Sequence, residues 1–183
     1  SVKLLTGSTA PEEALGSAHY LMIGLDDQYW GGHSAEGVAF SGSFATAKER
    51  TRANLKQALA EVQGRTLTEN LHFFSVKAYK AYADGTFAFN SYLAEEMVRR
   101  SDRLSLFLRK IYYREGAWNP AYRAVMQELW LLLLLGCFAA ALLRRKEYAV
   151  QLCALSLLGL TGYQLLFEVW PRYLFLYAPV FLV

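Results

Sequence analysis

The sequence has 183 residues, of which 54% are hydrophobic, 15% aromatic and 19% charged. A chain of this composition buries much of its surface, which excludes a mainly disordered segment or a solvated linker. Its net charge of +3 arises from basic residues scattered among acidic ones, whereas nucleic-acid phosphates are bound by clustered Lys and Arg. We therefore expect no nucleic-acid partner. The two cysteines, Cys137 and Cys153, are too few for a disulfide framework or a cysteine-rich zinc site, and we expect both to face lipid or to pack in the interior.

Residues 17–45 combine frequent glycine with interleaved aromatic and acidic residues, and no 3.6-residue period persists. This pattern predicts a shaped loop. Five of its side chains are of types that ligate Zn or Mn: His19, Asp26, Asp27, His33 and Glu36. Their spacing fits no ligand pattern, so we expect no cofactor and keep a divalent metal site as an alternative. The adjacent carboxylates of Asp26 and Asp27 suggest another alternative, a general base or a ligand for phosphate-bound metal.

Two helices with clear start signals are predicted next. Thr46 with Glu49 and Thr66 with Glu69 are spaced as capping boxes, which mark helix N-termini. The first helix is predicted over about 47–63, and the second ends before the turn dipeptide Asp84-Gly85. Each carries an apolar stripe at helical spacing. The stripe residues are Leu55, Leu59 and Val62 in the first helix, and Leu67, Leu71, Phe74, Ala78 and Tyr82 in the second.

A third helix is predicted from apolar residues spaced three or four apart. These residues are Leu93, Met97, Leu104, Leu108 and Ile111. Acidic residues lie near its start and basic ones near its end, the order that a helix dipole favours. They are Glu95 and Glu96 at the start, and Arg109, Lys110 and Arg114 at the end. We expect the basic end to approach lipid headgroups.

Two apolar segments, 124–143 and 148–167, have the roughly 20 residues that a helix needs to cross a bilayer. Residues 124–183 hold only seven charged residues against 28 in residues 1–123. A buried hairpin of a soluble domain is the alternative, but soluble domains rarely place two such runs side by side. The sequence therefore predicts a mainly α-helical, polytopic membrane protein.

The orientation follows from the basic connector at 144–147, because Lys and Arg in short loops stay on the cytoplasmic side. Residues 1–122 are then an extracytoplasmic, mostly helical region, and 168–172 form an external loop. Residues 173–183 start a third membrane segment, but 11 helical residues reach only about 16 Å and do not span. Since no signal segment precedes residues 1–122, we expect the chain to be an internal or C-terminal portion of a longer multi-pass protein of the cell membrane.

Several runs of residues resemble one family of enzymes. The runs are His19–Leu25, Gly31-Gly32, Phe40 with Ser43-Phe44, Lys48–Arg50 with Ala53-Asn54, Ala83–Phe87, and Glu168–Leu174. They look like parts of Gram-positive bacterial membrane glycosyltransferases, similar to the family 39, protein O-mannosyltransferase-like group. The last run resembles the motif E-x-R-P-R-Y-L near the C-terminus of those enzymes, with Trp170 where that family often has Arg. The resemblance covers about 17–90 and 124–183.

This resemblance implies a GT-C architecture, an external active site and a polyprenyl-phosphate-linked sugar as donor for a cell-envelope acceptor. The family's acidic catalytic base lies in a first external loop, so we expect this chain to be inactive by itself. We predict substrate binding by Arg172 and Tyr173, and by His19 and Asp26. A guanidinium at headgroup depth can bind phosphate with two parallel hydrogen bonds.

Three alternatives to this interpretation remain. Arg172 and Tyr173 have the composition of an interfacial anchor, and Glu168, four residues earlier, is placed to pair with Arg172. The whole chain is alternatively a non-catalytic, membrane-anchored binding or assembly module of the envelope.

Overall fold

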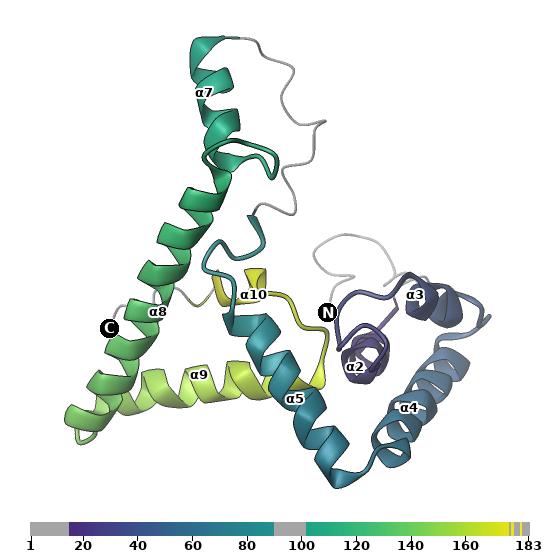
Figure 1. The fold of residues 1–183 in the computed structure, drawn as a ribbon. Helices are drawn as coiled ribbons and strands as arrows, with labels where there is room; N and C mark the ends of the chain where they lie inside the picture. The colour runs from purple at the N-terminus through teal and green to yellow at the C-terminus, as the bar shows by residue number, and fades with distance from the viewer. Residues whose placement is uncertain (1–14, 90–101, 176, 178–179, 181–183) are drawn as a thin grey trace, which may run out of the picture. The chain divides into compact units, whose positions relative to one another are not determined.

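The computed structural model describes residues 15–89, 102–175, 177 and 180 (Figure 1). The regular elements among these residues are helices, and none of these residues lies in a strand. The predicted fold class, mainly α-helical, is therefore confirmed. The protein divides into a first unit, Ser1–Ala78 with Gly162–Val169, and a second unit, Tyr79–Thr161 with Trp170–Val183.

The first unit begins with two short helices, α2 (Ser17–Leu25) and α3 (Ala35–Gly42), so the prediction of a loop over 17–45 is wrong. Nearly all of α2 from Ala18 onward is apolar and most of it is buried, so it has no polar face to create a 3.6-residue period. α3 begins because the Ser34 hydroxyl accepts a hydrogen bond from the Gly37 N–H at 2.9 Å. The frequent glycine of this region is more typical of a loop, so the sequence pattern did not predict either helix.

The next helices, α4 (Ala47–Gly64) and α5 (Leu67–Tyr82), begin where the capping boxes predict. At the first, the Glu49 N–H donates to the Thr46 hydroxyl at 3.2 Å and the Glu49 carboxylate accepts from the Thr46 N–H at 3.3 Å. The second repeats this arrangement with Thr66 and Glu69. Both start signals are therefore confirmed.

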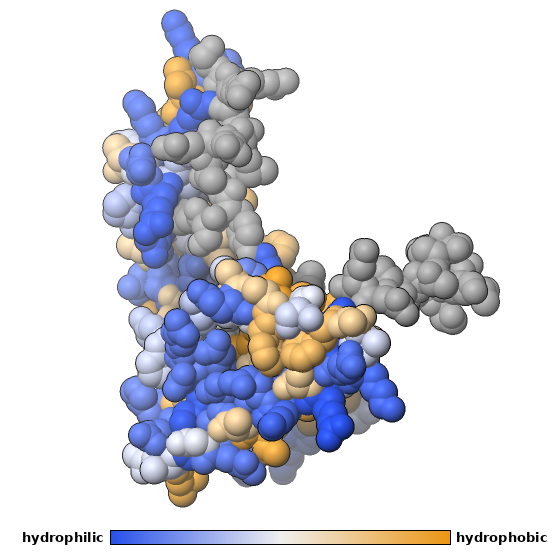
Figure 2. Space-filling view, turned by 90° about the vertical axis from the view of Figure 1, so that its right-hand side faces the viewer, coloured by the Kyte–Doolittle hydropathy of each residue, from blue (hydrophilic) through white to orange (hydrophobic). Residues whose placement is uncertain are grey.

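The predicted apolar stripes of these helices face the interior only in part: Val62 and Phe74 pack against a buried cluster, whereas the leucines do not. Leu55 and Leu59 are 46% and 56% exposed, and Leu67 is 77% exposed. The buried positions instead repeat every four residues and include polar side chains: Arg50, Asn54 and Ala58 in α4, and Phe73, Lys77 and Ala81 in α5. Figure 2 shows one face of the molecule, on which hydrophilic residues dominate and apolar residues form smaller patches.

The interior of the first unit is organised around a buried lysine. The Lys77 side chain is fully buried, and its ammonium donates hydrogen bonds to the carbonyls of Gly24, Leu165 and Phe167, the last two at 2.8 Å. Gly24 lies in the last turn of α2, and Leu165 lies in the last turn of α9 (Tyr148–Leu166). Carbonyls at a helix C-terminus lack intrahelical partners and carry partial negative charge. Lys77 therefore satisfies both helix ends at once.

The second unit contains α7 (Arg103–Tyr112), α8 (Asn119–Leu143), most of α9 and the short α10 (Arg172–Phe175). Asp102 caps α7 with extended backbone and accepts from the Ser105 N–H at 3.1 Å. A single helix through the third predicted apolar run is therefore wrong. Leu93, Met97 and the two glutamates predicted near its start lie outside the described residues.

Both α8 and α9 are long and apolar enough to cross a membrane. α8 ends at Leu143 as predicted but begins five residues earlier, where Pro120 suits the first helical turn. α9 runs from Tyr148 to Leu166, one residue short of the prediction. Only 6% and 11% of the residues in their most apolar windows are buried. Such exposure is unlike the core helix of a soluble domain, in which the apolar face is covered.

We predict that Lys77→Met unfolds the first unit more readily, because one buried and two partly buried carbonyls lose a charged donor. An unsatisfied buried polar group costs about 1–3 kcal/mol, so we expect a loss of about that size in the free energy of unfolding. Denaturant titration of the purified protein in detergent measures it. Lys56→Met on the exposed surface of α4 is the matched control, and equal effects of the two substitutions would contradict the role of Lys77.

Candidate functional site

Arg172 lies at the start of α10, directly after Pro171. Its guanidinium carbon is 5.1 Å from the centre of the Trp170 ring and 5.5 Å from that of Tyr173. These distances are those of cation–π contacts, which orient a guanidinium while leaving its charge in place. Leu174 of the same helix is fully buried in a cluster with Trp130 and Leu160. The short helix is therefore anchored by Leu174, and the adjacent rings orient Arg172.

Arg172 lines a cleft of about 750 Å³ in the second unit, a volume typical of small-molecule sites. The cleft is otherwise mostly aromatic. Its other lining residues are Gly85, Thr86, Phe87, Phe89, Tyr112, Tyr122, Met126 and Phe175. Tyr122 and Met126 belong to the first two turns of α8. The cleft therefore combines the cationic side chain of Arg172 with several aromatic rings and lies beside the N-terminal end of the apolar helix α8.

One wall of the cleft is the loop that follows α5. The Asp84 carboxylate accepts hydrogen bonds from the Thr86 N–H and hydroxyl at 2.9 and 2.6 Å and from the Ala88 N–H at 2.8 Å. Phe87 and Ala88 both adopt left-handed backbone, with φ of 53° and 60°, which is strained for residues other than glycine. Asp84 therefore fixes the position of the Phe87 ring.

The loop is also fastened to α8. The Gly85 N–H donates to Gln127 Oε1 at 2.8 Å, and a Cβ at Gly85 would collide with the Met126 carbonyl. Only glycine permits so close an approach. The Phe87 ring meets Trp130 edge to face, with 5.0 Å between ring centres, and Trp130 Nε1 donates to the Tyr82 carbonyl at 2.8 Å. This wall of the cleft is thus rigid.

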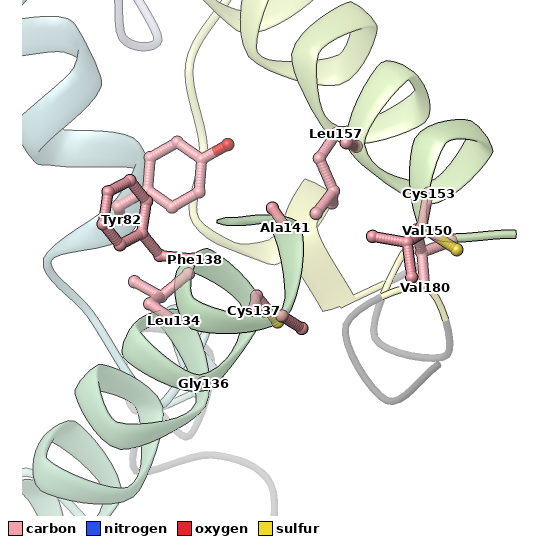
Figure 3. Close-up of a pocket in the computed structure, with 12 residues that line it drawn as sticks. Tyr82, Leu134, Gly136, Cys137, Phe138, Ala141, Val150, Cys153, Leu157 and Val180 are labelled. Carbon is pink, nitrogen blue, oxygen red and sulfur yellow. The ribbon is translucent and has the colours of Figure 1, made fainter. Parts of the chain in front are cut away.

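A second cavity of about 460 Å³ lies between α8 and α9 (Figure 3). Cys137 and Cys153 both line it, and both are free thiols. Its lining is otherwise apolar apart from Tyr82, whose hydroxyl is 2.5 Å from Thr161 Oγ1. The cavity is therefore lined mainly by apolar side chains.

His19 belongs to the interior of the first unit rather than to a cavity. It is 1% exposed, and its Nδ1 lies 2.7 Å from the Ser41 hydroxyl, which in turn donates to Asn54 Oδ1 at 3.0 Å. Burial lowers the pKa of His19, partly opposed by the charge of Glu168. These contacts explain His19 structurally, and its predicted role in substrate binding stays a prediction.

Asp26 lies at the C-terminal end of α2. Its Oδ1 accepts from the Gln28 N–H at 2.9 Å, and its carbonyl accepts from the Gly31 N–H at 2.9 Å. Partial burial raises the pKa of Asp26, and the hydrogen bond from Gln28 opposes the shift. This is the geometry of an Asx turn, so the residue has a structural role, and substrate binding by it also stays a prediction.

The five side chains considered for a metal do not gather. Among the residues that the structure describes, no three His, Cys, Asp or Glu side chains are placed to hold a metal ion. Glu36 instead accepts a hydrogen bond from the Tyr29 hydroxyl at 2.5 Å. His33 Nδ1 lies 3.6 Å from Oε1 of the largely buried Glu168.

The structure brings Arg172 together with residues that sequence reasoning did not select. Tyr112 and Tyr122 line its cleft but lie in segments without a recognised motif, and no sequence signal pointed to them. Phe87 belongs to a run quoted for the family resemblance, so a signal existed there. Tyr173, predicted to bind with Arg172, contacts the guanidinium through its ring.

Comparison with protein families identifies one match, which covers residues 9–183 and is described as conserved hypothetical integral membrane protein. Because the match spans nearly the whole chain, the chain belongs to this family of integral membrane proteins. Neither the curated proteins nor the solved structures gave a match.

We predict that the first unit loses stability as the pH falls below about 6.5, the ordinary pKa of histidine. Because the folded state binds a proton at His19 less readily than the unfolded state does, stability is complete above that pH and declines below it by up to about 1.4 kcal/mol per pH unit. His19→Gln should flatten this decline in melting curves between pH 7.5 and 5. His72→Gln on the exposed side of α5 is the control, and an equal change in both variants would refute the assignment.

Proposed function

We propose that this integral membrane protein is the C-terminal part of a glycosyltransferase of the GT-C type. It would move a sugar from a polyprenyl-phosphate donor to a cell-envelope acceptor at the outer face of the membrane. The observation that supports this proposal is the cleft in which Arg172 lies among aromatic side chains beside the first turns of α8.

The chemistry of the donor matches the composition of the cleft. A polyprenyl-phosphate sugar has an apolar tail, an anionic phosphate and a hydroxylated ring. The guanidinium of Arg172 suits the phosphate because its planar fork forms two parallel hydrogen bonds. The aromatic side chains suit the apolar tail. A donor of this kind is used where hydrocarbon meets water, and the cleft adjoins one end of a helix that is long enough to span the membrane.

The reaction joins an oxygen of the acceptor to C1 of the sugar and breaks the bond between C1 and the phosphate oxygen. The phosphate leaves with the bonding electron pair on the polyprenyl carrier, and a base takes the acceptor's proton. Arg172 would stabilise the charge that develops on the leaving phosphate. We assign the base to no residue of this chain.

We predict that Arg172→Ala weakens use of the donor by about tenfold to a hundredfold, since charge-assisted hydrogen bonds are worth roughly 1.5–3 kcal/mol each. Arg172→Lys should recover only part, because lysine keeps the charge but lacks the fork. The measurement is saturation of turnover by polyprenyl-phosphate hexoses in liposomes that contain the full-length protein, normalised to folded protein. Unchanged saturation in Arg172→Ala would leave Arg172 as an interfacial anchor only.

The proposal requires residues 1–122 outside the cytoplasmic membrane and Arg144–Lys146 inside. We predict that an impermeant maleimide labels a cysteine at Ser75, which is exposed on α5, and spares one at Lys146 in intact cells. Both variants are made without Cys137 and Cys153, and labelling after lysis shows that each site is reactive. Labelling of position 146 with protection of position 75 would reverse the orientation.

A further inference from the structure

The aromatic lining of the cleft around Arg172 falls into two groups. One group, the apolar side, consists of Phe87 and Phe175, with 5.9 Å between the centres of the two phenyl rings. The other group, the tyrosine side, carries two phenol hydroxyls. Tyr112 and Tyr122 meet there at 79° with 5.0 Å between ring centres, and Phe89 packs against Tyr112 at 5.9 Å.

We propose that Tyr112 and Tyr122 form the subsite for the sugar ring of the donor, whereas Phe87 and Phe175 receive the first isoprene units. This inference rests on the proposed function and deepens it. A pyranose presents C–H groups on its ring faces and hydroxyls around its rim. Aromatic faces carry negative charge that attracts C–H groups, and phenol hydroxyls donate to and accept from sugar hydroxyls. An isoprenoid tail has only C–H groups, so it gains nothing from the phenol hydroxyls.

The two tyrosines are held rigidly although they come from different helices. Tyr112 is the last residue of α7 and Tyr122 lies in the first turn of α8. At the corner between them, the Trp118 N–H donates to the Lys110 carbonyl at 2.8 Å and Asn119 Nδ2 donates to the Ile111 carbonyl at 2.9 Å. A Cβ at Gly116 would collide with the backbone there. Because both rings are held in place before a ligand binds, little conformational entropy is lost on binding.

The apolar side is fixed by other contacts. The Phe87 backbone is held in its left-handed conformation by Asp84, and its ring packs on the buried Trp130. Strained backbone of this kind persists where the surrounding structure enforces it, and it clusters at ligand sites. Because the two sides are built by separate contacts, a substitution on the tyrosine side should leave the isoprenoid side intact.

Two probes separate the two sides. One probe is a short polyprenyl phosphate that carries mannose, glucose or galactose, and the other is the same polyprenyl phosphate without a sugar. Binding of each to the full-length protein in nanodiscs is measured for Tyr112→Leu and Tyr122→Leu. We expect each substitution to weaken the best sugar-bearing probe by about three- to tenfold, the range set by aromatic contacts of roughly 0.5–1.5 kcal/mol. The sugar-free probe should change less than about twofold, whereas Arg172→Ala should weaken both.

Tyr148→Leu is the matched control, because Tyr148 is 73% exposed at the start of α9 and does not line the cleft. Should the leucine variants fail to fold, fluorotyrosine at position 112 or 122 provides a measurement that keeps both rings. Its ¹⁹F resonance should move with the sugar-bearing probe and stay in place with the sugar-free probe.

The outcomes separate the inference from the proposed function. Equal weakening of both probes by Tyr112→Leu, or equal ¹⁹F shifts, would overturn the sugar subsite and leave the donor site at Arg172 standing. Failure of the unaltered protein to bind either probe would overturn the proposed function, and the subsite with it.

Discussion

The fold of the first unit depends on one buried charge. Lys77 places an ammonium between the carbonyls of Gly24, Leu165 and Phe167, and the desolvation of that charge is tolerable only because helix C-termini surround it. This constraint explains why α2 lies so close to the end of α9 that a Cβ at Gly24 would meet the Phe167 backbone. It also explains which side of α5 is buried, because the Lys77 side chain must point into the interior of the first unit.

The interior of the second unit is organised by contacts of aromatic side chains instead of by a buried charge. Trp130 contacts Phe87 and donates to the Tyr82 carbonyl, and with Leu160 it covers Leu174 of α10. These contacts fix the segment that carries Arg172 against the middle of α8. The functional proposal therefore depends on a small apolar core whose members lie far apart in the sequence.

The sequence predicted those features that are encoded locally. Thr46 with Glu49 and Thr66 with Glu69 mark helix starts through side chains three residues apart, and the lengths of α8 and α9 follow from uninterrupted apolar runs. In contrast, residues far away in the sequence determine which face of a helix is buried. Leu67 was placed on an apolar stripe, but the inward positions of α5 carry Phe73 and Lys77 because distant carbonyls need a donor. Arg172 could be predicted as a binding residue from the motif in which it follows Pro171. Tyr112 lines the same cleft but lies 60 residues earlier in the sequence, where no motif pointed to it.

The position of Lys77 in the sequence also dictates an order of assembly during synthesis. Its acceptors Leu165 and Phe167 are 88 and 90 residues further along, so at about 5–20 residues per second the ribosome delivers them roughly 4 to 18 s later. Until then, Gly24 of α2 is the one of these three carbonyl acceptors that has been made. The first unit can therefore close only after α8 and α9 have both been synthesised.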